Sequence, residues 1–471
     1  MTEDGKISFT DVIDKNIIIS VKIALSYEPM WISSHWLFCD MGNGKMEIKQ
    51  KVKEAIAYII KAAKTLYGTL FKWIILSVVI GIGIGSLSSF FAKGIVYATE
   101  FRELHRWLIF GLPLAGLVIV WIYRRTGQGD NTGTDQVLST IRETEGVMPG
   151  RIAPLILVST ILTHLFGGSS GREGAALQFG ASLGNWLARV LHLNNSDRHI
   201  MMLAGMSAAF SALFGTPMAA AIFPMEVVSV GVMYYGALVP CMFSSFIAEQ
   251  MSVIWGVRTF AVPYPVTKMP NFYGISAVKI VLLAMVFSLV GAGFCAAMHR
   301  SSKLYKKYFP NPYLRVAVGG IAVIVLWLLV RTDDYIGLGG DVIARSFDGP
   351  EKIWVFVFKI LFTCLTLCAG FKGGEIVPSL FIGATLGSAL SGFIGLPVEL
   401  CAACGMAGVF CSVTNSPITA MLIAFELFKF DGMPYYCVVV ASCYLLSGYF
   451  SLYHEQKIMY SKTENKYRAG K

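Results

Sequence analysis

The stretch Gly167-Gly-Ser-Ser-Gly-Arg-Glu-Gly-Ala-Ala-Leu-Gln178 decides the fold class of this chain. It lies within an apolar, membrane-like region and places the ionisable Glu173 between Gly171 and Gly174. A charge at membrane depth is costly unless it lines a cavity, and irregular backbone is tolerated there only under the same condition. Glycines that open onto a helix present bare N–H groups and the positive end of the helix dipole. The stretch therefore predicts an anion site beside a titratable acid.

The composition is that of a membrane protein. Of the 471 residues, 55% are hydrophobic and 14% are charged, whereas about 25% are charged in soluble proteins. Apolar runs that span or nearly span a bilayer recur at 73–91, 107–123, 275–298, 316–330, 354–371 and 433–449. Runs broken by Gly or Pro lie at 177–187, 201–213, 218–229 and 378–394. Runs of about ten to fourteen residues cannot cross about 30 Å of hydrocarbon, so they predict re-entrant half-helices. We expect an all-α, polytopic integral membrane protein.

The formal net charge of +10 does not indicate a nucleic-acid partner. The cations cluster before the first span, in loops and near the C-terminus, at positions such as 45–64, 300–307 and 457–471. This distribution fits the positive-inside rule with both termini cytoplasmic, at the plasma membrane. Basic loops also raise the local concentration of anions.

The chain repeats itself. Gly180-Ala-Ser-Leu-Gly184 matches Gly383-Ala-Thr-Leu-Gly387, and the block from Gly205 to Glu226 resembles the block from Gly405 to Glu426. These matches predict two transmembrane repeats, 70–257 and 273–455, joined by a proline-containing loop over 258–272. Internal repeats with short, interrupted segments at matching positions point to the binding site of a transporter.

The ends of the chain differ from the spans. Residues 1–45 have mixed composition without the apolar core of a signal peptide, and predict a cytoplasmic tail or a mis-assigned start. Residues 46–69 predict an amphipathic basic helix that leads to the membrane, and residues 456–471 a basic tail. The cysteines and histidines show no disulfide framework and no metal spacing, so no metal or cofactor is expected.

Four motifs, in order, resemble those of the CLC chloride channel and transporter family. Gly171-Arg-Glu-Gly174 looks like its G-(K/R)-E-G signature, and Gly374-Glu-Ile-Val-Pro378 stands where the family has G-x-F-x-P. Phe214-Gly-Thr-Pro217 followed by Glu226 is similar to F-N-A-P followed by an acid, and Tyr453 matches the pore tyrosine. The resemblance, which covers about residues 65–460, implies a homodimer. Each subunit would have its own pore between inverted halves whose helix N-termini point at a central anion.

The chain also departs from the family pattern. Gly133-Thr134 replaces the family's G-S-G-I-P loop, and Val227 stands where chloride/proton antiporters often have an inner glutamate. Phe371-Lys-Gly-Gly-Glu375 resembles the fluoride/proton antiporter branch, which usually has Thr where this chain has Val377. In motif the chain is closest to that branch.

The candidate site residues follow from these motifs. Glu173 is the expected gating and proton glutamate: as a carboxylate it occupies an anion's place at the helix N-termini, and as a neutral acid it leaves that place. Glu375 is a possible proton route, with a vestibule acid as the alternative, and Glu226 and Glu426 are more typical of structural caps. The anion is expected to contact Gly133, Thr134, Gly171, Arg172, Gly174, Ala175, Ile376, Val377 and Tyr453.

We therefore expect a CLC-type halide transporter, with anion/proton antiport that exports fluoride as the first hypothesis. A chloride/proton antiporter and a passive chloride channel are the alternatives. An intramembrane enzyme would need a nucleophile–base or metal pair at membrane depth, and the sequence shows none. Its partners are a halide anion, protons, the lipid bilayer and a second copy of the chain.

Overall fold

The computed structural model describes residues 44–143, 146–257, 266, 269–464 and 466–468. The chain divides into two compact units, 1–73 and 74–471. The segment predicted over 1–45 lies outside the described residues except for its last two. The helix predicted over 46–69 is the N-terminal part of α2 (Gly44–Leu104), which runs on without a break. The fold and the site described below belong to the second unit.

After α2, further helices and one strand complete the first repeat. They are η2 (Arg106–Gly111), α3 (Leu112–Arg125), α4 (Thr134–Arg142), α5 (Ile152–Leu165), α6 (Glu173–Val190), α7 (Asn195–Phe214), α8 (Pro217–Val227), strand β1 (Ser229–Val230), η3 (Tyr235–Ala237) and α9 (Leu238–Ile254).

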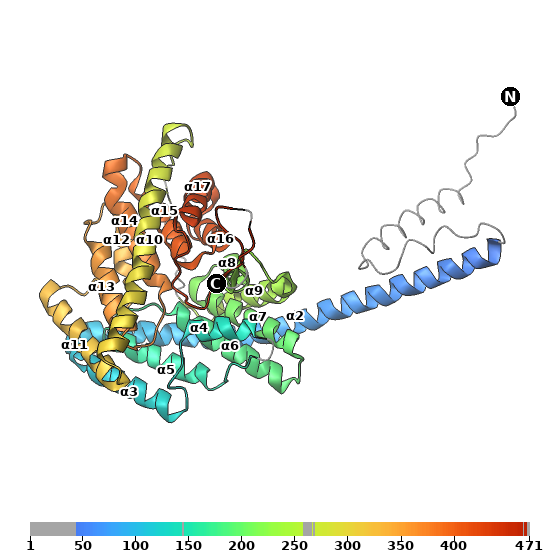
Figure 1. Ribbon diagram of the computed structural model, residues 1–471, viewed down its shortest axis with the longest axis horizontal. Helices are drawn as coiled ribbons and strands as arrows, with labels where there is room; N and C mark the ends of the chain where they lie inside the picture. The colour runs from blue at the N-terminus through green and yellow to red at the C-terminus, as the bar shows by residue number, and fades with distance from the viewer. Residues whose placement is uncertain (1–43, 144–145, 258–265, 267–268, 465, 469–471) are drawn as a thin grey trace. The chain divides into compact units, whose positions relative to one another are not determined.

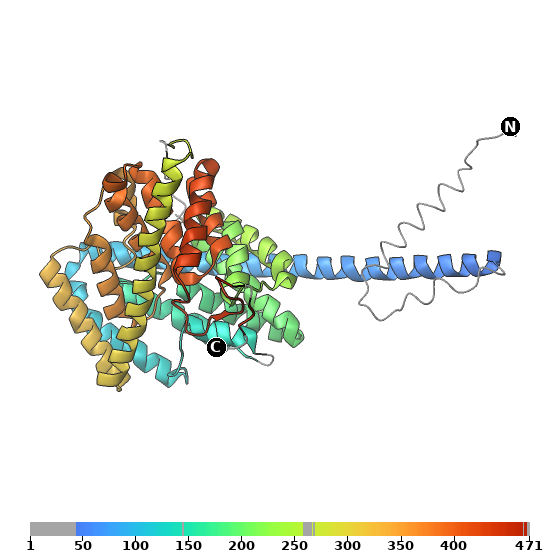
Figure 2. The ribbon, with the colours of Figure 1, turned by 45° about the horizontal axis from the view of Figure 1, so that its top comes forward.

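The second repeat has its α-helices in the same order, although its strand follows the last helix whereas β1 precedes α9. Its elements are α10 (Ile275–Tyr308), α11 (Pro312–Val330), α12 (Gly340–Asp348), α13 (Val355–Leu367), α14 (Ile376–Ile394), α15 (Val398–Thr414), α16 (Pro417–Phe428), η4 (Phe430–Gly432), α17 (Met433–Leu446) and strand β2 (Lys457–Ile458). Helices α10 and α17 run alongside each other in both views of the ribbon (Figures 1 and 2).

Six helices in the described part of the chain are long and apolar enough to cross a membrane. They are Lys53–Leu104, Arg106–Arg125, Tyr235–Ile254, Ile275–Tyr308, Pro312–Val330 and Ile376–Ile394. The sequence runs did not include the third of these. Its apolar pattern is interrupted by Ser244 and Ser245, which are buried against α7, where Ser244 donates to the Ala204 carbonyl at 3.0 Å. A hydroxyl that is satisfied inside the protein lowers hydropathy without exposing the helix to water.

The repeat extends over the whole unit. Helices α4 and α12 each have nine residues, and α8 and α16 have 11 and 12. These helices are too short to span a bilayer. The broken run at 218–229 predicted this for α8, whereas the short helices α4, α12 and α16 were not predicted. Gly171 and Gly374, at matching positions of the two repeats, pair in an antiparallel bridge. Antiparallel pairing of equivalent residues creates local two-fold symmetry, the relation expected of an inverted repeat.

The helices of each repeat cross at glycines. A Cβ added to Gly180 would meet the Gly205 backbone, and one added to Gly383 would meet the Gly405 backbone. These are matching α6–α7 and α14–α15 crossings. Association inside a membrane depends on such close backbone approach because lipid supplies no hydrophobic driving force between helices. The sequence repeats therefore record helix packing as well as the binding loops.

The segment after Tyr453 is anchored to the helix ends. Strand β2 pairs in parallel with β1, with Lys457 opposite Ser229. The Gln456 side chain donates to the carbonyls of Val227 at 3.0 Å and Thr414 at 2.6 Å. Lys462 donates to the Tyr444 carbonyl at 2.9 Å. These bonds fix the position of Tyr453 relative to the ends of α8, α15 and α17.

We expect Gly383→Ala to destabilise the protein by about 1–3 kcal/mol, because the new methyl group has no space against the α15 backbone. Gly392→Ala in the same helix is the matched control, since a Cβ there would meet nothing within 4 Å. Thermal unfolding of both variants in detergent, followed by tryptophan fluorescence, measures the difference. Equal melting temperatures for the two variants would contradict the packing role of Gly383.

Candidate anion and proton site

Two glycine loops from opposite repeats meet at the centre of the second unit. The Gly171 N–H donates to the Gly374 carbonyl at 2.6 Å, and the Gly374 N–H donates to the Gly171 carbonyl at 2.8 Å. Each loop leads directly into a helix, α6 from the first repeat and α14 from the second. The bridge therefore holds two helix N-termini beside each other.

Both helices begin with backbone N–H groups that have no partner within their own helix. In α6 the first hydrogen bond along the helix runs from the Ala176 N–H to the Arg172 carbonyl at 3.1 Å. The N–H groups of Gly174 and Ala175 come before it and have no partner within the helix. In α14 the corresponding bond runs from Ser379 to Glu375 at 3.1 Å. The amides of Ile376 and Val377 precede it. Two sets of free donors and two positive dipole ends thus converge, which favours an anion.

The carboxylate of Glu173 lies at this convergence. Glu173 is buried, and its Oε2 accepts a hydrogen bond from the Arg172 backbone N–H at 2.9 Å. The Val377 backbone N–H, from the other repeat, also faces the carboxylate. The Arg172 guanidinium is 3.9 Å from Oε1 and donates to the Leu213 carbonyl at 3.1 Å. Glu173 thus stands where the helix ends would hold an anion, and Arg172 contributes its backbone amide together with a nearby charge.

The glycines around Glu173 leave no space for side chains. A Cβ on Gly171 would meet the Glu173 carboxylate and lie 3.0 Å from the Gly374 carbonyl oxygen. A Cβ on Gly174 would lie 2.9 Å from the Gly374 Cα and 3.4 Å from the Glu375 Oε2. Close backbone approach is therefore the reason for glycine at these positions. The Glu375 carboxylate thus also approaches Gly174, the residue that follows Glu173.

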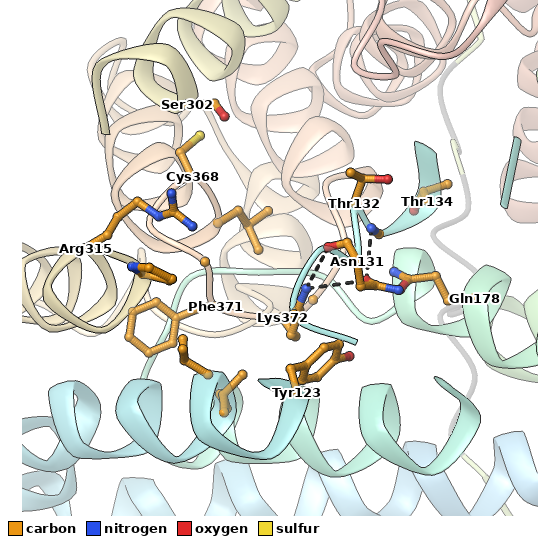
Figure 3. A pocket seen from close by; sticks show the side chains of 18 of the residues that line it. Tyr123, Asn131, Thr132, Thr134, Gln178, Ser302, Arg315, Cys368, Phe371 and Lys372 are labelled. Carbon is orange, nitrogen blue, oxygen red and sulfur yellow. Dashed lines mark hydrogen bonds between the residues drawn. The ribbon is translucent and has the colours of Figure 1, made fainter. Parts of the chain in front are cut away.

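A cavity of about 240 Å³ opens next to Glu375 (Figure 3). Its charged lining residues are Arg124, Lys306, Arg315, Lys372 and Glu375. A second cavity of about 890 Å³ shares Arg124, Lys306 and Arg315 with it and adds Asp135, His454 and Glu455. The cations outnumber the acids among the lining residues of the first cavity, which favours anions there.

Lys372 is the cation that directly precedes the glycine pair of the second loop. Its Nζ lies 3.4 Å from the Asn131 carbonyl oxygen and 4.4 Å from the centre of the Tyr123 ring (Figure 3). Asn131 in turn accepts from the Gly133 N–H at 3.0 Å. Lys372 therefore links the loop before α14 with the loop before α4, and it places a positive charge at the end of the cavity.

Glu375 lines the cavity and also approaches Gly174, which follows Glu173. Its Oε2 is buried without a hydrogen-bond partner in the described part of the chain. The charged groups that face it are Asp135, Glu173 and Lys372. A buried polar atom without a partner requires an explanation, such as a water, an ion or a proton that the group exchanges.

Thr134 and Tyr453 approach the same region from other elements. Thr134 is the first residue of α4, follows Gly133 at φ 75°, and lines the cavity. The buried Tyr453 hydroxyl has no hydrogen-bond partner among the described residues, and Glu375, Asp135 and Glu173 are the acids that face it. A phenol can donate one hydrogen bond, so the Tyr453 hydroxyl is an unused donor in the described part of the chain. Thr134 and Glu375 line the same cavity.

Comparison with known proteins agrees with this geometry. The family model described as "Voltage gated chloride channel" matches residues 115–448. The chain belongs to this CLC family. A "Chloride/fluoride channel protein" of Pseudomonas syringae is 36% identical over 397 residues, which cover 83% of this chain and 87% of that protein. The "H(+)/Cl(-) exchange transporter ClcA" of Yersinia pestis is 22% identical and covers 75% and 80%.

Solved CLC structures share the fold. A crystal structure of a CLC-type fluoride/proton antiporter matches with a TM-score of 0.79 at 34% identity, covering 83% of this chain and 99% of that one. A slow cyanobacterial Cl⁻/H⁺ antiporter matches with a TM-score of 0.70 at 18% identity, covering 80% and 94%. The predictions of the family, of an all-α multi-pass membrane protein and of CLC-type inverted repeats are confirmed.

Glu226 and Glu426 cap helices of the opposite repeats. Glu226, in the last turn of α8, accepts from the backbone N–H groups of Ile418 and Thr419 at 2.9 and 2.8 Å. Glu426 accepts from those of Met218 and Ala219 at 2.8 and 2.9 Å. Each acid therefore neutralises the N-terminus of the other acid's helix. This reciprocal arrangement fits the cap that the sequence favoured for both.

Three polar residues of the structure have no role predicted from the sequence. Lys372 and Gln178 line the cavity, and the Gln178 side chain donates to the Gly174 carbonyl at 3.0 Å. Lys359 is fully buried and donates to the Gly337 carbonyl at 2.9 Å. The signal for Lys359 was present, because an ionisable residue inside an apolar run is a functional-site candidate.

We expect Glu226→Gln to lower the free energy of unfolding by about 1.5–3 kcal/mol. The carboxylate accepts from two backbone N–H groups and the Thr419 hydroxyl, whereas an amide is uncharged and has only one acceptor oxygen. Glu103→Gln is the control, because its side chain is exposed. Melting temperatures in detergent measure both variants. If Glu226→Gln melts like the control, the reciprocal cap does not stabilise the fold.

Proposed function

We propose that this protein is a CLC-type halide/proton antiporter that exports fluoride. The observation that carries the proposal is the position of Glu173, whose carboxylate lies at the N-termini of two helices from opposite repeats. A relative named a chloride/fluoride channel protein at 36% identity and a fluoride/proton antiporter structure at 34% identity support the choice of anion. Chloride/proton antiport and passive chloride conduction are the alternatives.

In the proposed mechanism, Glu173 and the anion compete for the same donors. The ionised carboxylate takes the N–H groups at the helix ends and excludes a second negative charge. A protonated Glu173 no longer needs those donors, so the anion can take its place. The proposed anion contacts are the backbone or side chains of Gly133, Thr134, Gly171, Arg172, Gly174, Ala175, Ile376, Val377 and Tyr453. Val377 offers its N–H alone, and Thr134 adds a hydroxyl.

Glu375 completes the proposed proton route. It lines the cavity, lies next to Gly174 and has a carboxylate oxygen without a partner in the described chain. A proton that enters through the cavity can reach Glu375 and then Glu173 across this short separation. The cations Lys372 and Arg315 would draw the anion into the same cavity. This route replaces the inner glutamate, whose place Val227 occupies.

We further propose a homodimer in the plasma membrane, with both termini on the cytoplasmic side and no enzymatic activity. The family consists of channels and transporters, and an antiport mechanism needs no catalytic chemistry. The basic loops and the basic C-terminal segment support the orientation. The experiment that tests the function is reconstitution in liposomes, with fluoride efflux, chloride efflux and proton uptake measured in parallel. Chloride efflux that exceeds fluoride efflux would contradict fluoride export.

Glu173→Gln should mimic permanent protonation. We expect anion flux to persist or rise, whereas proton uptake falls to the background of empty liposomes. The wild type should exchange anions faster as the pH falls, because protonation frees the helix ends, and the variant should lose that pH dependence. Proton pumping with unchanged coupling in Glu173→Gln would remove this residue from the gate.

Glu375→Gln should reduce proton-coupled transport at least tenfold, because the amide cannot pass a proton between the cavity and Glu173. Anion binding, measured by isothermal titration with fluoride, should remain within a few-fold of wild type. Glu143→Gln, at an exposed position, is the matched control. Normal coupled flux in Glu375→Gln would show that protons take another route.

A further inference from the structure

Three sulfur atoms gather beside the cavity, and one of them, that of Cys368, belongs to a residue that lines it. Met298 comes from α10, Cys364 from α13, and Cys368 from the C-cap of α13. The Cys364 Sγ lies 3.6 Å and the Cys368 Sγ 3.8 Å from the Met298 Sδ. The two thiols, one helical turn apart, also contact each other. The cluster therefore forms a triangle of two thiols and one thioether from two packed helices.

We propose that Met298, Cys364 and Cys368 bind a soft monovalent metal ion, with Cu(I) as the physiological class. Thiolate and thioether ligands select Cu(I) over hard cations. A planar three-coordinate ion with metal–sulfur bonds of about 2.3 Å separates its ligands by about 4 Å. The sulfur separations from Met298 are close to this value, so the triangle needs little rearrangement to receive an ion.

The ion can reach the cluster from the cavity. Cys364 is buried, whereas Cys368 is partly exposed and lines the cavity beside Ser302 and Arg315 (Figure 3). Binding releases two thiol protons into the cavity, and the Cu(I) dithiolate then has one net negative charge. Arg315, which donates to the Ala369 carbonyl at 3.3 Å, is the adjacent cation that offsets this charge.

Other buried cysteines of this protein are arranged differently. The thiols of Cys411 and Cys443 donate to the carbonyls of Val440 and Ala284 at 3.6 and 3.4 Å. These contacts satisfy each thiol singly, as expected of cysteines that act as small apolar residues. In the Met298 cluster the Cys368 thiol also donates to a carbonyl, that of Met298 at 3.3 Å, but here both thiols lie in addition within 3.8 Å of a third sulfur.

Binding can be measured on the full chain in detergent without any transport assay. Cu(I), kept reduced with ascorbate, is titrated in competition with bathocuproine disulfonate under nitrogen. We expect one competed Cu(I) for each wild-type chain, loss of that equivalent in Cys368→Ser, and at least tenfold weaker binding in Met298→Leu. Cys437→Ser, which removes a partly exposed thiol in α17, is the matched control and should retain the full equivalent.

The outcomes separate the proposal from ordinary packing and from the transport function. Cys368→Ser that elutes like wild type on size exclusion but still competes for one Cu(I) would overturn the site. So would a wild type that takes no Cu(I) from the chelator. If Cys364→Ser fails to fold, the Cu(I) titrations of Cys368→Ser and Met298→Leu still test the proposed site. Failure of fluoride export in liposomes would leave this binding result unchanged.

Discussion

The antiparallel pairing of Gly171 with Gly374 is the contact on which the rest of the site depends. Two glycine backbones approach so closely that a Cβ at either position would meet the backbone of the opposite loop. This approach brings two helix N-termini together and directs their unpaired N–H groups at one place. Glu173 is ionisable, buried and adjacent to both sets of donors, so its protonation state decides whether an anion can share the place. If the two loops were farther apart, each helix end would bind an anion separately. The protonation of Glu173 would then no longer be coupled to anion binding.

Half-helices inside a membrane leave backbone groups that water cannot satisfy, and this protein satisfies them across the repeats. Glu226 binds the first amides of α16, and Glu426 binds those of α8. Carbonyls near the C-terminal helix ends are bound by cations instead: Arg102 donates to His164, Arg172 to Leu213 and Lys462 to Tyr444. These charges follow the helix dipoles, with acids at N-termini and cations at C-termini. The N-termini of α6 and α14 follow the same rule, but there the acid is also the proposed gate.

The cavity and the gate are joined by residues from different parts of the chain. Lys372 links the loops before α4 and α14, and Glu375 lies beside Gly174. The segment that follows Tyr453 is held by Gln456 and Lys462 against the ends of three helices, which fixes the backbone next to the tyrosine. An anion and a proton would therefore approach Glu173 through a shared entrance, whose cations attract the anion and whose acid can carry the proton.

The sequence by itself determined the family, the membrane-spanning class and the two repeats, because apolar length, glycine spacing and an acid at membrane depth are local features. It also predicted Glu173 and the loop glycines as site residues, because their chemistry depends on adjacent residues. It missed the span over Tyr235–Ile254 and the roles of Lys359, Lys372 and Gln178. Only the tertiary structure decided which helix each acid caps, that Glu375 adjoins Glu173 across Gly174, and that three sulfurs meet. These relations join residues of different helices, often some 200 positions apart in the chain, and pairings at that range are set by helix packing.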